Sequence, residues 1–262
     1  MSPVDPHVVH NQVRERYASI AKSGCGCTSA CCTPSGDNHA RVSATLGYSE
    51  QEIHSTPQGA NMGLGCGNPQ AIANLKPGET VVDLGCGGGF DCFLAARQVG
   101  ENGMVIGIDM TPDMISKARA NAKEARFANV EFRLGEIEHL PVADDSVDVI
   151  ISNCVINLSP DKLQVYREAF RVLRPGGRLA ISDVVAVRNL PEEINSDSDV
   201  YHGCVAGAAL VSDVEQMLRE AGFSKIKIDI KHESREFIKD WFPGTGIEDY
   251  VRSATIEARK EA

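Results

Sequence analysis

The stretch VVDLGCGGGFDCFLAARQVG, residues 81–100, predicts a strand, a glycine-rich turn and a helix. Asp83 stands near the end of the strand, and Gly85, Gly87 and Gly89 follow at alternate positions. Glycines permit a tight turn and let a ligand approach the backbone without a Cβ atom in the way. The first turn of the following helix also offers free N–H groups. A turn of this kind is typical of a nucleotide-cofactor site, which we expect here.

The charge beside the turn narrows the choice of cofactor. The spacing is G-x-G-x-G after Asp83, and a carboxylate there would repel a pyrophosphate. It suits a ligand that carries an ammonium and a sulfonium charge. Asp109, in the segment GIDM, ends the next predicted strand and can accept hydrogen bonds from both hydroxyls of a ribose. A nicotinamide-binding Rossmann domain is the alternative interpretation of the turn.

Strands and helices alternate along most of the chain. Strands are predicted at 80–84, 104–108, 130–134, 147–152 and 178–184, and helices at 90–99, 112–127, 160–173 and 211–221. This alternation predicts an α/β fold with a doubly wound parallel sheet. Residues 7–22 predict a preceding helix, and Ser49 with Glu52 predicts a capped short one. The insertion at 191–208 should lie over the carboxyl ends of the strands, where such sheets bind ligands.

Composition and charge exclude several classes of protein. The 262 residues carry a net charge of −10 and are 42% hydrophobic, which suits a buried aliphatic core. An acidic chain argues against nucleic-acid binding, and its charge is read first as an aid to solubility. No run approaches the ~20 apolar residues that span a bilayer, and the first residues do not resemble a signal peptide. We expect a cytoplasmic monomer without nucleic-acid or membrane partners.

Nine cysteines are many for such a chain, and the number is odd. Because we expect a reducing cytoplasm, the thiols should be free, and metal, metalloid or redox chemistry becomes a hypothesis. The run CGCTSACC, residues 25–32, lacks paired C-x-x-C modules, so we expect a thiol-rich arm rather than a zinc finger. Cys86 and Cys92 are expected to pack as small hydrophobic side chains.

Three further cysteines follow the pattern of the predicted sheet. Cys66 precedes the first strand, Cys154 follows the fourth, and Cys204 lies in the insertion after the fifth. In a doubly wound fold all three approach the rim of the cofactor site. A soft trivalent ion such as As(III) prefers thiolates. Three thiolates would hold a pyramidal As(III) with its lone pair directed away from the sulfur atoms.

The segments DLGCGGG, GIDM, GEIEHLPVADDSVDVIISNCVINL and VLRPGGRLAISDVV resemble, in order, the class I S-adenosylmethionine-dependent methyltransferases. The resemblance implies that Gly85 and Gly87 line the methionine part of the cofactor. It also implies that Asp109 and Met110 meet the ribose and adenine, and that Ile137 and Glu138 flank the adenine. Asn153 would close the site from the fourth strand. With Asp83, the expected cofactor residues are Asp83, Gly85, Gly87, Asp109, Met110, Ile137, Glu138 and Asn153.

A closer resemblance, on GCGNPQAIANLKPGETVVDLGCGGGFDCFLAARQVG and ISNCVINLSPDK, is to the arsenite methyltransferases. It implies that Cys66, Cys154 and Cys204 hold the arsenic and that an N-terminal cysteine, Cys32 or Cys31, has a redox role. The implied substrates are S-adenosylmethionine, arsenite and methylated trivalent arsenicals. The implied mechanism is direct displacement by the arsenic lone pair, with a thioredoxin- or glutathione-like dithiol as reductant.

The resemblance also divides the chain and leaves alternatives open. Residues 1–75 form an N-terminal cap with the cysteine-rich loop, 76–186 the cofactor-binding core, and 187–262 the rest of the fold with the arsenic-binding insertion. Leu64 stands where eukaryotic members often carry an aromatic residue, and the chain lacks the C-terminal region of longer members, so the final product stays open. The alternatives are a non-catalytic thiol module for soft metals and a small-molecule carbon or oxygen methyltransferase.

Overall fold

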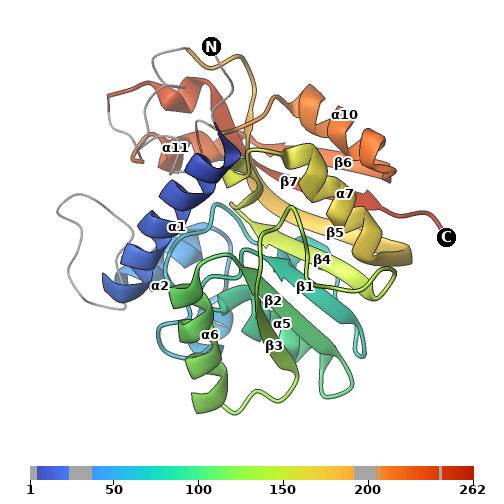
Figure 1. Ribbon diagram of the computed structural model, residues 1–262. Helices are drawn as coiled ribbons and strands as arrows, with labels where there is room; N and C mark the ends of the chain where they lie inside the picture. Colours follow the sequence, from blue (N-terminus) through green and yellow to red (C-terminus); the bar gives the residue numbers. More distant parts are fainter. Residues whose placement is uncertain (1–4, 24–36, 192–204, 206, 242–243) are drawn as a thin grey trace.

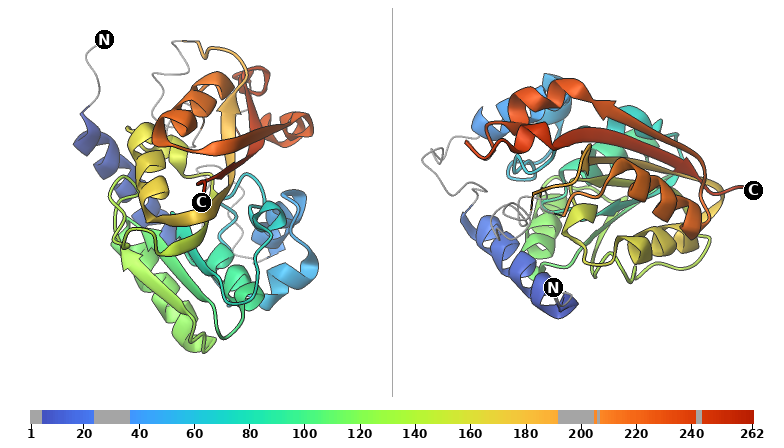
Figure 2. Two further views of the ribbon diagram at one scale, coloured as in Figure 1. Left: turned by 90° about the vertical axis from the view of Figure 1, so that its right-hand side faces the viewer. Right: turned by 90° about the horizontal axis from the view of Figure 1, so that it is seen from above.

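In the computed structural model, which describes residues 5–23, 37–191, 205, 207–241 and 244–262, a sheet of seven strands runs through the centre. The strand order is β3-β2-β1-β4-β5-β7-β6 (Figures 1 and 2). The strands are β1 Thr80–Leu84, β2 Met104–Asp109, β3 Val130–Leu134, β4 Val147–Asn153, β5 Leu173–Ala186, β6 Ser224–Lys231 and β7 Val251–Arg259.

The predicted doubly wound sheet is confirmed, and two strands extend it. Strands β1 to β5 pair in parallel, whereas β7 runs antiparallel between β5 and β6. Neither β6 nor β7 is among the strands predicted above. The partner of β7 is β5, more than 60 positions earlier in the chain, so the pairing has no local signature.

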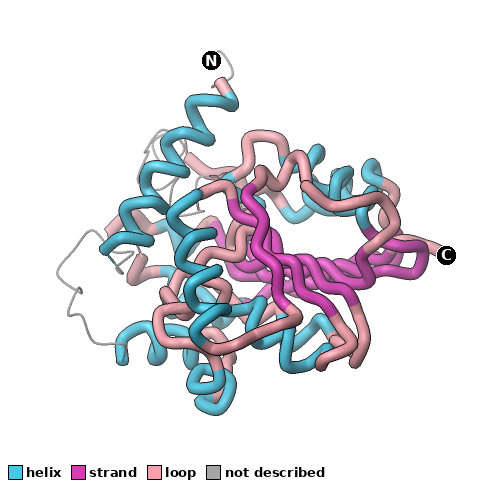
Figure 3. Tube along the Cα trace, turned by 60° about the horizontal axis from the view of Figure 1, so that its bottom comes forward, coloured by secondary structure: helices cyan, strands magenta, loops and turns pink. Residues whose placement is uncertain are grey.

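Helices cover both faces of the sheet (Figure 3). Val81, Val149 and Ile151 point to the face that α5 (Phe90–Val99) and α6 (Pro112–Glu124) cover. Their neighbours Val82 and Ile150 point to the face of α7 (Lys162–Val172) and α10 (Val211–Ala221). In the sequence, parallel strands that are buried on both faces appear as continuous aliphatic runs. Among the described helices, none is long and apolar enough to cross a membrane.

The remaining elements complete the chain order around the sheet. They are α1 Pro6–Ser23, α2 Asp37–Thr45, α3 Glu50–Ser55, α4 Gln70–Ala73, α5 Phe90–Val99, α6 Pro112–Glu124, η1 Ile156–Leu158, α7 Lys162–Val172, α10 Val211–Ala221, η2 His232–Ser234, α11 Arg235–Ile238 and η3 Ile247–Asp249.

Local capping explains where several helices begin and end. The predicted capping box is confirmed, because Ser49 accepts from the N–H of Glu52 and the Glu52 side chain accepts in return. Asp161 caps α7, so this helix begins two residues later than the predicted 160. Arg126 has φ +58°, and α6 therefore ends before the predicted 127. Strand β5 is longer than the predicted 178–184.

An ion pair ties the N-terminal side of the sheet to α4. Both guanidinium Nη atoms of Arg178 donate to the Glu79 carboxylate at 2.8 Å, and its Nε donates to the carbonyl of Ala73 at 2.7 Å. Burial by itself would raise the pKa of Glu79, but the Arg178 hydrogen bonds outweigh it and lower that pKa. This contact fixes the segment that runs from the Cys66 turn into β1.

Candidate active site

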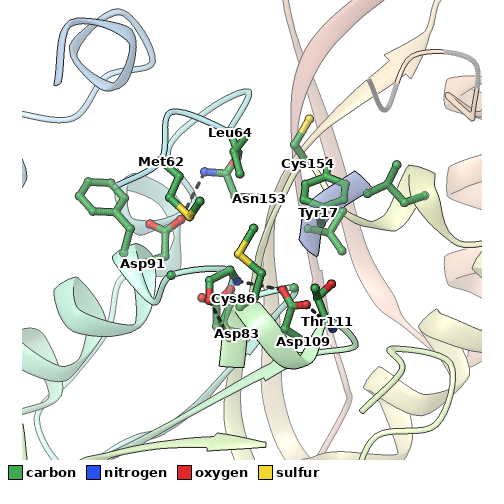
Figure 4. Close-up of a pocket in the computed structure, with 18 of the residues that line it drawn as sticks. Tyr17, Met62, Leu64, Asp83, Cys86, Asp91, Asp109, Thr111, Asn153 and Cys154 are labelled. Atoms are coloured by element: carbon green, nitrogen blue, oxygen red, sulfur yellow. Dashed lines mark hydrogen bonds between the residues drawn. The ribbon is translucent and has the colours of Figure 1, made fainter. Parts of the chain in front are cut away.

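A deep pocket lies over the carboxyl ends of β1, β2 and β4 (Figure 4). Its empty volume is about 1090 Å³, open solvent at its mouth included. Its wall comes from the strand ends, from the loop at 60–65 and from α1. Asp91 and Met62 lie at one side of the pocket, and Cys154 and Tyr17 lie at the other.

The glycine turn after β1 forms the floor of the pocket. Gly85 and Gly87 have φ of +70° and +51°, and the N–H groups of Gly85 and Cys86 donate to the carbonyl of Ile108. A Cβ atom on Gly85 would meet the Val155 side chain at 2.5 Å. A Cβ atom on Gly87 would meet no protein atom within 4 Å, because this residue faces the pocket. The turn thus needs glycine for packing at one position and leaves room for a ligand at the other.

Asp109 braces this turn from the end of β2. One carboxylate oxygen accepts from the N–H of Gly87 at 3.0 Å and the other from the N–H of Thr111 at 2.8 Å. Burial raises the pKa of Asp109 despite these hydrogen bonds. Each carboxylate oxygen can accept a second hydrogen bond. Asp109 and the adjacent Met110 both line the pocket, which suits contact with a ribose.

Asp83 and Cys92 form a buried pair beneath the turn. The Cys92 thiol donates to a carboxylate oxygen of Asp83 at 3.1 Å. Burial, followed by the field of Asp91, raises the pKa of Asp83 well above its ordinary value. Burial also raises the pKa of the Cys86 thiol to about 11 and raises the pKa of the Cys92 thiol well above its ordinary value. Both cysteines are buried as expected, but Cys92 also orients an expected cofactor residue.

Asn153 links the pocket wall to the turn that carries Cys66. Its amide nitrogen lies 2.8 Å from the carbonyl of Gly67, 3.0 Å from the Tyr48 hydroxyl and 3.3 Å from the Asp91 carboxylate. Its amide oxygen accepts from the N–H of Cys66 at 3.0 Å. The Tyr48 hydroxyl donates to Asp91 at 2.8 Å. Neither Tyr48 nor Asp91 is singled out by the sequence motifs.

Two of the three predicted arsenic ligands meet beside this pocket, which Cys154 lines. The sulfur atoms of Cys66 and Cys154 and a carboxylate oxygen of Asp183 all lie within 4.8 Å of one another, and all three residues are buried. Cys154 has φ +60° and donates its N–H to the carbonyl of Ser182. The Cys66 sulfur lies 3.7 Å from the same carbonyl. The two turns are therefore held to β5 at one point.

Asp183 is a neighbour of the thiols that sequence reasoning missed. One of its carboxylate oxygens accepts from the N–H of Val184 at 2.7 Å and from the Asn157 amide at 2.9 Å. The other accepts from the N–H of Ile156 at 3.0 Å. Burial raises the pKa of Asp183 to about 6, although these hydrogen bonds oppose the rise. Its signal in the sequence is an acid within the apolar run AISDVVA.

The other predicted thiols lie outside the described residues, as does most of the insertion at 191–208. They are Cys25, Cys27, Cys31, Cys32 and Cys204. Val205, which follows Cys204 in the chain, is fully buried in the same apolar cluster as Cys66 and Cys154. This cluster lies where the three thiols were expected to converge.

Helix α1 supplies part of the pocket wall that the motifs did not predict. Its residues His10 and Tyr17 line the pocket. The Nε2 atom of His10 lies 3.0 Å from a carboxylate oxygen of Glu138, to which the Ser159 hydroxyl also donates. Glu138 and Ile137 both line the pocket, at the end where adenine was expected. In the sequence, the predicted helix at 7–22 was the only sign of this part of the pocket wall.

Leu64 also lines the pocket, in an apolar cluster with Tyr17. The cluster contains Met62, Met114 and Ile20 as well. The pocket wall therefore has an aliphatic side chain where the resemblance predicted an aromatic residue. The aromatic ring beside it is that of Tyr17 in α1.

The sheet order, with β7 antiparallel, and the pocket over the glycine turn define a class I S-adenosylmethionine-dependent methyltransferase. A family described as methyltransferase domain matches residues 75–222. A crystal structure of an arsenic(III) S-adenosylmethionine methyltransferase from Chlamydomonas reinhardtii is 35% identical, with a TM-score of 0.62, over 84% of this chain and 73% of that one.

The chain belongs to the arsenite methyltransferase family. It is 54% identical to an arsenite methyltransferase of Halobacterium salinarum over 98% of this chain and 68% of that protein. It is 41% identical to one from Aquipseudomonas alcaligenes over 82% of this chain and 62% of that protein. The chain thus spans about two thirds of the length of these relatives.

Proposed function

We propose that this protein transfers the methyl group of S-adenosylmethionine to As(III) held by the thiolates of Cys66, Cys154 and Cys204. The observation that carries the proposal is the convergence of the Cys66 and Cys154 sulfurs beside the cofactor pocket, which Cys154 lines. Two buried thiols within 4.8 Å of each other suit a soft trivalent ion. The burial of Val205 beside them supports the third ligand.

The residues of the pocket fit S-adenosylmethionine. The buried Asp83 carboxylate suits the ammonium group, the open side of Gly87 leaves room for the methionine part, and Asp109 retains acceptors for the ribose. When bound, the cofactor supplies an electrophilic methyl group on a sulfonium centre. Asp83, Asp109 and Glu138 would orient it, and Cys154 lines the same pocket.

The thiols bring arsenite into reach by ligand exchange. Each thiol that binds As(OH)₃ replaces one hydroxyl, and its proton leaves with that hydroxyl as water. Three exchanges leave a pyramidal arsenic with a lone pair. Holding the reacting atoms ~3–3.5 Å apart contributes about 7–11 kcal/mol to such a displacement. The arsenic lone pair forms the new bond to carbon as the sulfonium–carbon bond breaks.

The proposed cycle ends with a reduction. Methylation of the lone pair leaves arsenic formally pentavalent, and two electrons restore the trivalent state. Two enzyme thiolates supply them and become a disulfide, with Cys32 or Cys31 as one partner. A thioredoxin-like dithiol, or two molecules of a glutathione-like thiol, then reduces that disulfide by thiol exchange, which requires accessible sulfur atoms.

The decisive experiment incubates the protein with arsenite, S-adenosylmethionine and a dithiol and identifies the arsenic species by mass spectrometry. We expect methylated arsenic from the wild type and none from Cys66→Ser, Cys154→Ser or Cys204→Ser, each of which should still bind S-adenosylhomocysteine. Asp83→Asn is the contrasting variant, because it should weaken cofactor binding and leave arsenite binding intact. Tight arsenite binding without formation of S-adenosylhomocysteine would instead identify a non-catalytic thiol module.

A further inference from the structure

Asp183 is a buried carboxylate beside the substrate thiols that the proposed chemistry does not use. Only 3% of its surface is exposed. Among the described residues, Cys66, Cys154 and Asp183 are the one group of three in which potential metal ligands all lie within 4.8 Å of one another. A buried polar group is expected to have hydrogen-bond partners. The partners of each Asp183 carboxylate oxygen therefore show how many lone pairs are already in use.

The two carboxylate oxygens of Asp183 are not equally occupied. One accepts two hydrogen bonds, from the N–H of Val184 and the amide of Asn157. The other accepts one, from the N–H of Ile156. Because a carboxylate oxygen can accept two hydrogen bonds, the second oxygen keeps a place for one more donor. A donor carried by bound arsenite would fill that place.

Arsenite bound by two thiols carries such a donor. In water it is As(OH)₃, and exchange with two thiols gives As(OH) bound to two sulfurs and releases two water molecules. No oxidant or reductant takes part. The hydroxyl that remains on arsenic has a hydrogen to donate inside a buried site. Leaving it without an acceptor would cost free energy.

We propose that Asp183 accepts a hydrogen bond from the hydroxyl group left on arsenic after Cys66 and Cys154 have each displaced one hydroxyl. This inference rests on the proposed function and makes Asp183 a substrate-contacting residue. A methylated arsenical, CH₃As(OH)₂, has no hydroxyl left after the same two exchanges. Asp183 therefore favours arsenite over methylated arsenicals in the two-thiol state, until the third thiol releases the last hydroxyl as water.

The test uses Cys204→Ser protein, in which the two-thiol state is the end point. Affinities for arsenite and for methylarsenite are measured with and without the added change Asp183→Asn. The asparagine oxygen should face the two donors of Val184 and Asn157, so a charge-assisted hydrogen bond to arsenic is lost. We expect arsenite affinity to fall about five- to tenfold and methylarsenite affinity to change less than about twofold.

Controls separate this contact from a structural role and from the thiol chemistry. Asp83→Asn in the same background should weaken cofactor binding and leave the ratio of the two arsenical affinities unchanged. An equal loss for both arsenicals in Asp183→Asn, or no loss for either, would overturn the inference and leave thiol ligation standing. Unchanged binding of both arsenicals after the added change Cys66→Ser would instead overturn the proposed function.

A spectroscopic measurement avoids dependence on the folding of the Asp183 variant. X-ray absorption at the arsenic edge of Cys204→Ser protein with arsenite should show two sulfur neighbours and one oxygen neighbour. With methylarsenite it should show two sulfurs and one carbon. An arsenite complex without an oxygen neighbour has no hydroxyl for Asp183 to hold, and that result would contradict the inference.

Discussion

The side-chain oxygen of Asn153 accepts the backbone N–H of Cys66 at 3.0 Å. Asn153 ends β4 and lines the cofactor pocket, whereas Cys66 lies in the turn ahead of β1. A Cβ atom on the intervening Gly65 would come within 2.7 Å of the Asn153 amide. One pocket residue thus positions, through the backbone, a thiol that we propose binds arsenic.

We expect Asn153→Asp to weaken the use of both substrates. The new carboxylate would face Asp91, which now accepts from the Asn153 amide, and like charges repel. The apparent KM should rise by about tenfold for arsenite and for the cofactor, since several hydrogen bonds are lost. Steady-state kinetics in each substrate measure this effect. Tyr48→Phe, which removes one hydroxyl of the same network, should have a smaller effect in the same direction. A change confined to the cofactor KM would argue against the link to Cys66.

The thiol of Cys92 should matter for the cofactor and not for arsenic. Cys92→Ala removes the donor to Asp83 and should raise the KM for S-adenosylmethionine by about fivefold. Cys92→Ser keeps a donor and should stay within about twofold of the wild type. The KM for arsenite should be unaffected in both. Equal cofactor KM values for the alanine and serine variants would show that Cys92 only fills space.

Gly85 and Gly87 form a matched pair, because both have positive φ. Alanine at either position costs about 1–2 kcal/mol in backbone strain. At Gly85 it also overlaps Val155, which adds about 1–3 kcal/mol. Gly85→Ala should therefore unfold at a clearly lower temperature than Gly87→Ala. The Gly87 variant should keep its fold and lose cofactor affinity, as calorimetry with S-adenosylhomocysteine would reveal. Normal cofactor affinity in Gly87→Ala would contradict the placement of the ligand.

The Glu79–Arg178 ion pair predicts loss of stability in acid. The pKa of Glu79 is lowered from its ordinary value of 4.5, mainly by Arg178 acting against burial. The pair is therefore fully stabilising above pH 4.5 and loses its contribution as the pH falls through the lower, folded-state pKa. Glu79→Gln should cost about 1–3 kcal/mol at pH 7 and flatten the decline below pH 4.5. Urea unfolding across that pH range measures both effects. If the free energy of unfolding declined in parallel in the variant and the wild type, the stabilising role of the ion pair would be refuted.

The elements that could be predicted from sequence are those with a local cause. The glycine turn after β1 follows from backbone freedom at Gly85 and Gly87, and the cap of α3 from the spacing of Ser49 and Glu52. Strand β6 has alternating isoleucines in SKIKIDIK, a pattern that indicates a half-buried strand. Strand β7 has no such local pattern, because its place between β5 and β6 depends on partners distant in the chain.

By itself, the sequence determined the parallel sheet, the cofactor turn and the strand ends where Asp109 and Asn153 stand, because period, turn chemistry and charge act over a few residues. Only the tertiary structure brought Cys66 and Cys154 together and added Asp183 beside them. It also decided that the Cys92 thiol donates a hydrogen bond to Asp83 and that Tyr48 and His10 line the pocket. These contacts join residues far apart in the chain, and they form only when the sheet and its helices pack.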